Sequence, residues 1–415
     1  MTDPYQIGIG SSHSGTSHAT HNPLNHHPGS HVGGGSSLGS GGKTLGGLFF
    51  SQSNATKSLR LIDRRMRGWE LGLPSYVRYE GFAEEFAHLK NVFPLGLQSE
   101  HRTPILIAVG GGKGGVGKSL VTANLAVRLA STGLRVLAMD VDIGGANLHT
   151  YFGINQPKFN LADVMIYRRK SLSDVLIQTP VDRVKLIAGG GEEVWGGTGV
   201  ITDESLAVIF QGILTAGSTL GTDVILLDLG AGTQYHTLDF FLAAHLGLVT
   251  VLPEPTSIEN AYLFMKMALF RMVEHIGVRT NDRQAADSVK KCLLSEDFGE
   301  VRGHRISGYA EKLRMIATKY PHFVTQLALA LSGRTLGLAM NQVRSQKDID
   351  IGRSMELIGE RYFGFHTRNC GHLNYDEAAW KSLRNRRLLV VDFPHSILAK
   401  KFSELAKSVL NHLGY

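Results

Sequence analysis

The stretch that most constrains this chain is the run from Gly110 to Ser119, which reads G-G-G-K-G-G-V-G-K-S. An apolar run, Ile105 to Val109, precedes it, and a segment with helical patterning, Leu120 to Ala130, follows it. Strand, glycine-rich loop and helix in this order form a phosphate-binding loop. The glycines let successive backbone N–H groups point at phosphate oxygens, and the helix N-terminus adds the positive end of its dipole. The sequence therefore predicts a nucleotide site.

Two residues at the end of the loop carry specific chemistry. We expect Lys118 to reach the β- and γ-phosphates, and we expect the Ser119 hydroxyl to bind Mg²⁺. The alternative is a chance glycine-rich loop with a solvated lysine, which the full spacing and the preceding strand disfavour. The loop residues expected to line the nucleotide are Gly112, Lys113, Gly114, Gly115, Val116, Gly117, Lys118 and Ser119.

Three carboxylates follow apolar strands. Asp140 and Asp142 come after the predicted strand Leu134 to Met139, and Asp228 comes after the apolar run Val224 to Leu227. Carboxylates at strand ends beside a phosphate loop are costly unless they meet a cation or orient water. We expect Asp142 to polarise the attacking water, Asp140 to hold the loop or the Mg²⁺ shell, and Asp228 to hold Mg²⁺ through water. A pair of surface turn aspartates is the alternative for the first two.

Lys113 completes the pattern K-G-G-x-G-K-S, which resembles the deviant Walker A motif of the MinD/ParA family of P-loop ATPases. The runs D-V-D-I-G-G-A-N-L, D-L-G-A-G-T and D-E-A-A-W-K-S-L-R-N-R-R are most similar to its FlhG/FleN branch, which sets flagellar number and placement. The resemblance implies ATP and Mg²⁺ as cofactors and an ATP-dependent homodimer. It also implies that Lys113 acts in catalysis on the partner's phosphates, beside Lys118 and Asp142, and that Asn341 binds the adenine.

Strand and helix patterns alternate from Ile105 to Leu413, which predicts an α/β fold with a mostly parallel, doubly wound sheet flanked by helices. We expect residues 1–54 to be a disordered tail rich in Gly, Ser and His, and residues 55–103 to hold a basic helix and a connector with a short helix around Phe82 to Leu89. Residues 104–415 form the ATPase domain, and residues 277–332 are expected to be a helical insertion.

The sequence also predicts four features of local structure outside the phosphate loop and the strand-end carboxylates. A helix is expected over Leu161 to Ile177, and Thr256 or Ser257 is expected to N-cap a helix that runs through Phe270. The segment after Gly371, ending in L-L-V-V, resembles the adenine-side loop and last strand of the family. The final helix, His395 to Leu413, is amphipathic, and two alternatives stay open for it: packing on the core, or reversible docking on an anionic membrane.

The composition of the chain limits where in the cell it is expected to act. The sequence has no apolar run of about 18 residues and no apolar signal core, so we expect neither a transmembrane helix nor secretion. Cys292 and Cys370 are the only cysteines, which fits a reducing cytoplasm and argues against a disulfide framework or an iron–sulfur site. The formal charge of +7 permits contact with anionic lipid or nucleic acid. The expected location is cytoplasmic, with peripheral attachment to the inner face of the membrane left open.

Together these features predict a switch that dimerises with ATP, hydrolyses it when a partner protein stimulates it, and positions a flagellar, polar or cell-division structure. One alternative is a ParA-type partition ATPase that binds DNA without sequence preference. Another is a scaffold that binds nucleotide without hydrolysis, against which Lys118, Asp142 and Asp228 all argue.

Overall fold

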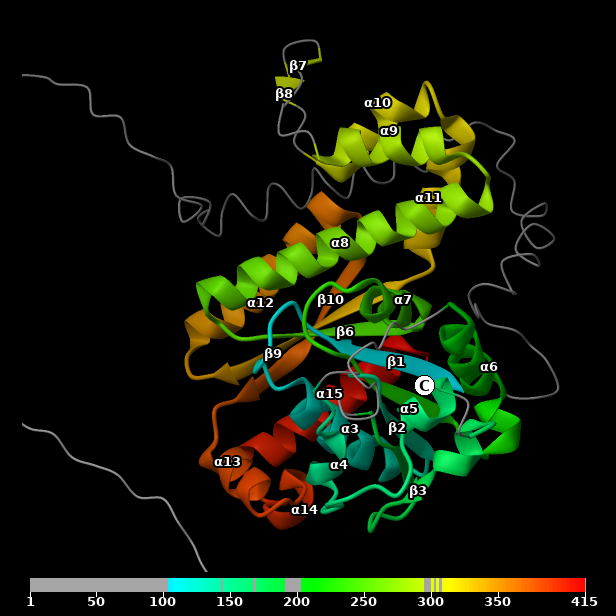
Figure 1. Ribbon diagram of the computed structural model, residues 1–415. Coiled ribbons are helices and arrows are strands. Elements are labelled where there is room, and N and C mark those ends of the chain that lie inside the picture. Colours follow the sequence, from blue (N-terminus) through cyan, green and yellow to red (C-terminus); the bar gives the residue numbers. More distant parts are fainter. Residues whose placement is uncertain are drawn as a thin grey trace, which may run out of the picture. The chain divides into compact units, whose positions relative to one another are not determined.

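The computed structural model describes residues 104–142, 145–166, 169–190, 203–294, 300–301, 304–305 and 308–414. The predicted tail and the basic helix with its connector lie outside these residues, and the domain boundaries stay predictions. The described part contains an eight-stranded sheet in the order β10-β9-β6-β1-β5-β2-β4-β3 (Figure 1). Its strands are β1 Ile105–Gly110, β2 Val136–Asp140, β3 Ile177–Gln178, β4 Val184–Ile187, β5 Val224–Asp228, β6 Leu246–Val251, β9 Thr335–Val343 and β10 His366–Asn374.

All neighbouring strands of this sheet are parallel except the edge pair β3 and β4, so the predicted mostly parallel fold is confirmed. The central strands are continuous apolar runs because helices cover both of their faces. Every residue of β5 and β6 is buried. The parallel arrangement brings the carboxyl ends of β1, β2, β5, β6 and β9 to one edge of the sheet, where ligands bind in folds of this kind.

Two helical layers enclose the sheet (Figure 1). The helices whose apolar residues join the core on one face are α3 Lys118–Ala130, α4 Leu148–Tyr151, α13 Glu377–Arg384, α14 Leu389–Asp392 and α15 Ile397–His412. Those on the other face are α5 Leu161–Met165, α6 Asp203–Thr219, α7 Tyr235–Ala243, α8 Pro255–Arg279 and α12 Gln346–Ile358. A π-helical turn, η4 Gly359–Phe363, continues α12. In the described part of the chain no helix has both the length and the apolar character that crossing a bilayer requires.

The final helix, α15, belongs to the core. Its apolar residues Leu398, Phe402, Leu405 and Val409 are at most 2% exposed and pack in the same cluster as residues of α3 and β10. The helix begins where Ser396 accepts a hydrogen bond from the backbone N–H of Ala399 at 3.1 Å. The core-packing alternative is therefore the one that this structure shows, and reversible docking of the helix on a membrane stays a prediction.

Two further expectations about secondary structure are wrong. The stretch Leu161 to Ile177 is not one helix: α5 ends at Met165, a 3₁₀ turn (η2) spans Leu172–Val175, and β3 follows. Asn160 and Ser171 each begin a capping box, so the segment has two separate helix starts. The L-L-V-V run is not a strand, because Leu389–Asp392 forms the helical turn α14. The strand of that region is β10, which precedes it.

The start of α8 also differs from the prediction. Glu254 occupies the N-cap position and Pro255 the first turn, where its fixed φ and missing N–H are tolerated. Ser257 does not cap the helix; its hydroxyl accepts a hydrogen bond from the backbone N–H of Leu252 at 3.0 Å. The helix continues past Phe270 to Arg279, so it leads directly into the region of residues 277–332.

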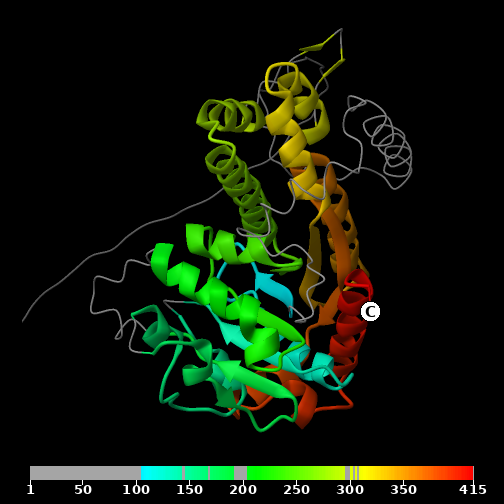
Figure 2. The same cartoon turned by 90° about the vertical axis from the view of Figure 1, so that its right-hand side faces the viewer.

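The described part of that region is mainly helical, as expected. It contains α9 Arg283–Leu294, α10 Tyr309–Ala317 and α11 Pro321–Ser332, with a short antiparallel pair, β7 Glu300–Val301 and β8 His304–Arg305. The helices lie beyond the C-terminal part of α8, away from the strand ends that carry the phosphate loop (Figures 1 and 2). Apolar residues of these helices, such as Val289, Leu313 and Leu327, belong to the same buried cluster as the apolar residues of α8.

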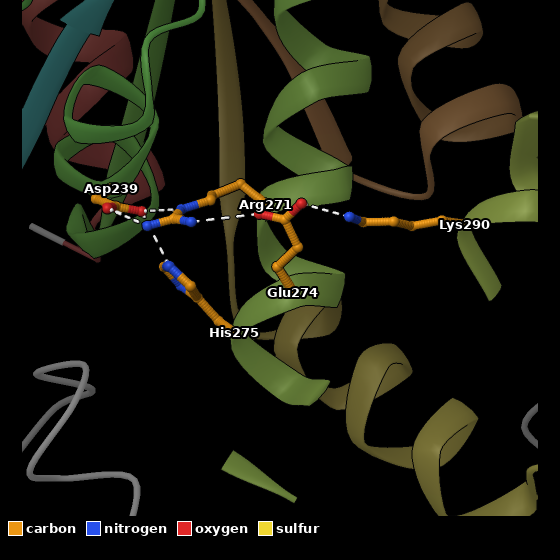
Figure 3. Close-up of polar contacts among 5 residues, drawn as sticks. All are labelled: Asp239, Arg271, Glu274, His275 and Lys290. Atoms are coloured by element: carbon orange, nitrogen blue, oxygen red, sulfur yellow. Dashed lines mark hydrogen bonds and ion pairs between the residues drawn. The ribbon is translucent and has the colours of Figure 1, made fainter. Parts of the chain in front are cut away.

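A charged cluster connects α7, α8 and α9 (Figure 3). The Arg271 guanidinium of α8 donates two 2.7 Å hydrogen bonds to Asp239 of α7, and it also donates to Glu274 at 3.3 Å. His275 Nε2 lies 3.0 Å from Asp239 Oδ1, and Lys290 of α9 pairs with Glu274. Because α7 directly follows the loop after Asp228, this cluster ties that loop to the helical region.

Candidate functional site

The phosphate loop has the backbone conformation that its glycines predict. Gly115 and Gly117 have φ of +78° and +94°, a region that residues with side chains rarely adopt. Gly117 is the residue before α3, so the loop feeds directly into a helix N-terminus. A Cβ at Gly112 would lie 1.9 Å from the carbonyl oxygen of Asn260, so only glycine lets the loop pass this close to α8.

Lys118, the first residue of α3, is buried at the base of the loop with 8% exposure. Burial lowers the pKa of Lys118, and the charges of Asp228, Asp142 and Asp140 act in the opposite direction. The three carboxylates predicted from separate strand ends therefore surround the predicted phosphate-binding lysine. The Lys118 ammonium therefore lies at the base of the loop that is predicted to bind the phosphates.

Asp228 is adjacent to Asp140, because the two are register partners at the ends of β5 and β2. Asp228 accepts side-chain hydrogen bonds from Ser119 and from Thr122, the latter at 3.1 Å. Burial raises the pKa of Asp228 to about 6, while Ser119, Lys118 and Thr122 limit the rise. Thr122 was not predicted as part of the site. Its position three residues after Ser119 places both on one face of α3, and that spacing is the signal that could have identified it.

These residues fit a magnesium ion held together with a nucleotide. No group of three or more His, Cys, Asp or Glu side chains in the described ranges forms a closed metal site. Mg²⁺ in nucleotide sites takes few protein ligands and completes its shell with phosphate oxygens and water. The Ser119 hydroxyl, hydrogen-bonded to the Asp228 carboxylate, is the donor set that such an ion requires.

Asp140 holds the backbone that follows β2. Its Oδ1 accepts a hydrogen bond from Asp142 N and its Oδ2 accepts one from Leu148 N, both at 3.0 Å. Burial raises its pKa well above the ordinary value, and Asp228 adds to the rise. Of the two roles predicted for Asp140, the geometry supports the loop-holding one, and the metal role stays a prediction.

Asp142 is half-buried and faces the loop that follows Asp228. Its Oδ1 accepts a hydrogen bond from Gly145 N at 3.1 Å, and a Cβ at Gly230 would lie 3.1 Å from the same oxygen. The carboxylate therefore touches the backbone of the Gly-containing loop L-G-A-G-T, whose second glycine, Gly232, has φ of +90°. Asp142 is the half-buried member of the carboxylate group, whereas Asp140 and Asp228 are fully buried.

Lys113, near the start of the loop, differs from Lys118 in its surroundings. Its side chain is exposed, and Nζ donates a 3.3 Å hydrogen bond to Thr256 Oγ1 at the start of α8. The structure thus separates the two lysines of the motif: Lys118 is buried among carboxylates and Lys113 faces outward. The contact with Thr256 was not predicted, and no sequence signal identifies it.

Asn341, the residue predicted to bind adenine, lies against the phosphate loop. Its Nδ2 donates a 2.8 Å hydrogen bond to the carbonyl oxygen of Val116, and its Oδ1 accepts one from Gln342 N at 2.9 Å. A Cβ at Gly117 would lie 2.3 Å from the same Nδ2. Asn341 is therefore hydrogen-bonded to the phosphate loop, and its predicted contact with adenine stays a prediction.

Comparison with known proteins finds similarity to one family of P-loop NTPases. The family model that matches residues 103–281 is ParA, described as "NUBPL iron-transfer P-loop NTPase". The antiactivator FleN of Pseudomonas aeruginosa is 29% identical over 307 residues, which cover 73% of this chain and 85% of FleN. The septum site-determining protein MinD of Helicobacter pylori is 32% identical over 192 residues, 46% of this chain and 65% of MinD. The flagellum site-determining protein YlxH of the same organism is 32% identical over 161 residues, 39% of this chain and 52% of YlxH.

Solved structures with a similar arrangement include the cell division ATPase MinD of Pyrococcus furiosus, with a TM-score of 0.47 and 21% identity over 74% of this chain and 98% of that one. MinD of Pyrococcus horikoshii, solved with Mg-ADP, has a TM-score of 0.47 and 20% identity over 75% of this chain and 98% of that one.

Proposed function

We propose that this chain is a P-loop NTPase of the ParA family, which hydrolyses ATP as a dimerising switch and controls the placement of a flagellar, polar or cell-division structure. The observation that carries the proposal is the difference between the two lysines: Lys118 is buried near the strand-end carboxylates, whereas Lys113 is exposed and bonded to Thr256. An exposed loop lysine supports a role on a second subunit.

Within one subunit the residues divide the chemistry as follows. Lys118 and the loop N–H groups bind the β- and γ-phosphates, and the Ser119 hydroxyl with Asp228 holds Mg²⁺. The ion, when bound, neutralises charge that develops on the phosphate oxygens. Asp142, the half-buried carboxylate that touches the Gly230 backbone, orients the attacking water. Its contact with that loop makes the loop responsive to the γ-phosphate.

Lys113 supplies the dimer dependence. A charge delivered from a second subunit accelerates phosphoryl transfer in the same way as an arginine finger, so hydrolysis waits for the dimer. In the single chain, Lys113 is instead hydrogen-bonded to Thr256 at 3.3 Å, an exposed contact that costs little to exchange.

The cellular role rests on the relatives. FleN, of which this chain covers 85%, is named an antiactivator, and the H. pylori relatives are named site-determining proteins for the septum and the flagellum. We infer a role in placement or number of such a structure, in the cytoplasm or at the inner face of the membrane, with a partner protein that stimulates hydrolysis. In this structure the apolar face of α15 is buried, so docking on a membrane through this face would require the helix to leave the core.

The test is subunit complementation. Lys113→Ala and Asp142→Ala are each expected to abolish hydrolysis while leaving ATP binding intact. Mixed together, they form heterodimers in which one site has its own Asp142 and receives Lys113 from the other subunit. Recovery of up to one active site per mixed dimer supports the proposal. If Lys113→Ala retains full hydrolysis, or if the mixture stays inactive although mass measurement shows mixed dimers, the switch does not work in this way.

Iron–sulfur carriage, which the description of the family model suggests, does not fit this chain. Cluster ligation takes four cysteine thiolates or an equivalent set, and a dimer would need a suitably spaced pair from each subunit. The chain has Cys292 on α9 and the buried Cys370 on β10, which lie on separate elements. Burial also raises the pKa of Cys370 to about 12, so its thiol stays protonated at neutral pH.

A further inference from the structure

Large apolar side chains are exposed together on the segment of α13, α14 and the start of α15. Trp380, Leu383, Val391 and Ile397 are 60%, 42%, 54% and 64% exposed. They are four of the eleven large apolar side chains exposed in the described residues, and they fall within one short stretch of chain. We call this stretch, residues 380–397, the α13–α14 surface. Exposed apolar residues that cluster in this way mark an interaction site more often than scattered ones do.

The same surface is basic. Between Glu377 and Asp392 the chain has four cations and two carboxylates, and all four cations are exposed: Lys381, Arg384, Arg386 and Arg387. The Arg384 guanidinium lies 5.2 Å from the centre of the Trp380 ring, which is a cation–π distance. Tryptophan and arginine are the residue types that dominate binding energy at protein interfaces. An occupant of this surface should therefore present apolar side chains flanked by carboxylates.

The surface is fixed to the nucleotide-binding part of the fold. The Val390 backbone N–H donates a 3.0 Å hydrogen bond to Asn124 Oδ1 of α3, the helix that begins at Lys118. Arg386 hydrogen-bonds to Asn155, in the loop that follows α4. Leu389 is fully buried beneath the surface. The site is thus pre-formed, which lowers the entropic cost of docking.

One segment of this chain has the complementary chemistry. The run from Glu80 to Leu89 reads E-G-F-A-E-E-F-A-H-L, and Phe82, Phe86 and Leu89 follow helical spacing, i, i+4 and i+7. Its three carboxylates are Glu80, Glu84 and Glu85. The segment lies outside the described residues, and its helix is a prediction from sequence. Another copy of the α13–α14 surface carries the same positive charge, so self-association through it is disfavoured.

We propose that Glu80 to Leu89 docks on the α13–α14 surface of its own chain as a short amphipathic helix. Phe82 and Phe86 pack against Trp380 and Leu383, and the carboxylates face Lys381 and Arg384. The chain between Leu89 and the start of β1 can span roughly 50 Å when extended, so its length allows the contact. Through Asn124 and Asn155, docking is linked to the nucleotide site. Only that link rests on the proposed function; the docking itself does not.

The experiment reads the environment of Trp380 in the full chain without nucleotide. Trp69→Phe and Trp195→Phe leave Trp380 as the only tryptophan. Docking predicts blue-shifted emission with weak quenching by acrylamide, an uncharged quencher that the charge exchanges neither attract nor repel. Glu84→Lys with Glu85→Lys, or Lys381→Glu with Arg384→Glu, should lower the docking equilibrium roughly five- to tenfold and increase quenching. The four changes together restore opposite charges and should restore protection. Glu100→Lys and Lys347→Glu, which lie outside the segment and the surface, serve as matched controls.

Each other outcome overturns the proposal. Equal quenching in all variants means that nothing covers Trp380. Protection that increases with protein concentration identifies a second copy as the occupant. Protection that appears only with phosphatidylglycerol vesicles identifies a membrane. Restoration by the combined charge exchange cannot arise from misfolding, because two disruptive pairs of changes would then add. Because the assay contains no ATP, a failure of the switch function leaves its result interpretable.

Discussion

Asn341 Nδ2 donates a 2.8 Å hydrogen bond to the carbonyl oxygen of Val116, a residue 225 positions earlier in the chain. Through this bond the end of β9 fixes the middle of the phosphate loop, between its two left-handed glycines. The loop is therefore held by tertiary contact as well as by its own glycines, and its shape depends on a residue that no local pattern connects to it.

Asn341→Ala should loosen the phosphate loop. The substitution leaves the buried Val116 carbonyl without its donor, which costs about 1–3 kcal/mol of unfolding free energy. Nucleotide affinity should fall with it, because the loop N–H groups are no longer pre-arranged. Denaturant unfolding and titration with a fluorescent ATP analogue measure the two effects. Unchanged stability together with lost affinity would instead point to a direct contact between Asn341 and the base.

Lys118→Ala and Lys113→Ala should separate binding from catalysis. Lys118 is buried among three carboxylates, so its loss removes the phosphate contact and leaves their repulsion unopposed. Nucleotide binding should then be undetectable. Lys113 is exposed and bonded only at 3.3 Å to Thr256, so its loss should leave binding within about twofold of wild type. Equilibrium titration with nucleotide measures the affinity of both variants. Equal losses of affinity would contradict the assignment of binding to Lys118 and catalysis to Lys113.

Asp142→Ala should bind ATP and fail to hydrolyse it, and the protein should accumulate as an ATP-bound dimer. The reason is that Asp142 orients the attacking water, whereas Lys118 and Ser119 bind the phosphates. Light scattering coupled to size exclusion, with ATP and with ADP, measures the dimer. Asp182→Ala is a suitable control, since the Asp182 side chain is 94% exposed and pairs only at 3.6 Å with Arg183 in the part of the chain that the structure describes. Normal turnover in Asp142→Ala would assign the water to another residue.

The nucleotide-free protein should lose stability as pH rises toward neutrality. Burial raises the pKa of Asp228 from 3.8 to about 6, so the folded chain binds more protons than the unfolded chain between these values. The unfolding free energy therefore falls through this window, by up to about 1.4 kcal/mol per pH unit. Asp228→Asn should flatten the slope and stabilise the nucleotide-free protein at pH 7.5. Denaturant unfolding midpoints measured between pH 4 and 7.5 test this prediction. If stability falls with pH as steeply in Asp228→Asn as in the wild type, the prediction is refuted.

The charged cluster of Figure 3 should matter for stability. Arg271 is 23% exposed and Asp239 13% exposed, so Arg271→Ala leaves a largely desolvated carboxylate and should cost about 2–4 kcal/mol. Arg353→Ala removes a guanidinium that is 67% exposed and pairs with Asp350, and it should cost less than about 1 kcal/mol. Thermal or denaturant unfolding compares the two. Similar losses would mean that the cluster is no more than a surface feature.

The sequence predicts the fold and the phosphate site well because both depend on local patterns. The loop glycines, Lys118 and the strand-end aspartates Asp140 and Asp228 each follow an apolar run or spacing that is visible in the chain. The structure brings these residues together as expected, through parallel register between β1, β2 and β5. Their catalytic roles remain to be measured.

What the sequence does not predict depends on contacts between distant segments. No local pattern predicts that the Asn341 amide bonds to the phosphate loop, because this contact depends on the packing of β9 beside that loop. The L-L-V-V run has strand composition, but Asn124 of α3 accepts a hydrogen bond from Val390, and the run forms a helical turn. The amphipathic pattern of α15 suits a membrane and a core equally, and in this structure its apolar face packs in one cluster with that of α3.

The place of α15 has a consequence for how the protein is made. Arg128 of α3 donates a hydrogen bond to the Ala399 carbonyl of α15, across 271 residues of chain. A ribosome adding 5–20 residues per second needs roughly 15–55 s to travel that distance. Throughout that time the helix behind the phosphate loop has been synthesised but lacks its covering partner. Until α15 has emerged, the nascent chain therefore exposes the apolar face of α3 that α15 covers in the folded protein.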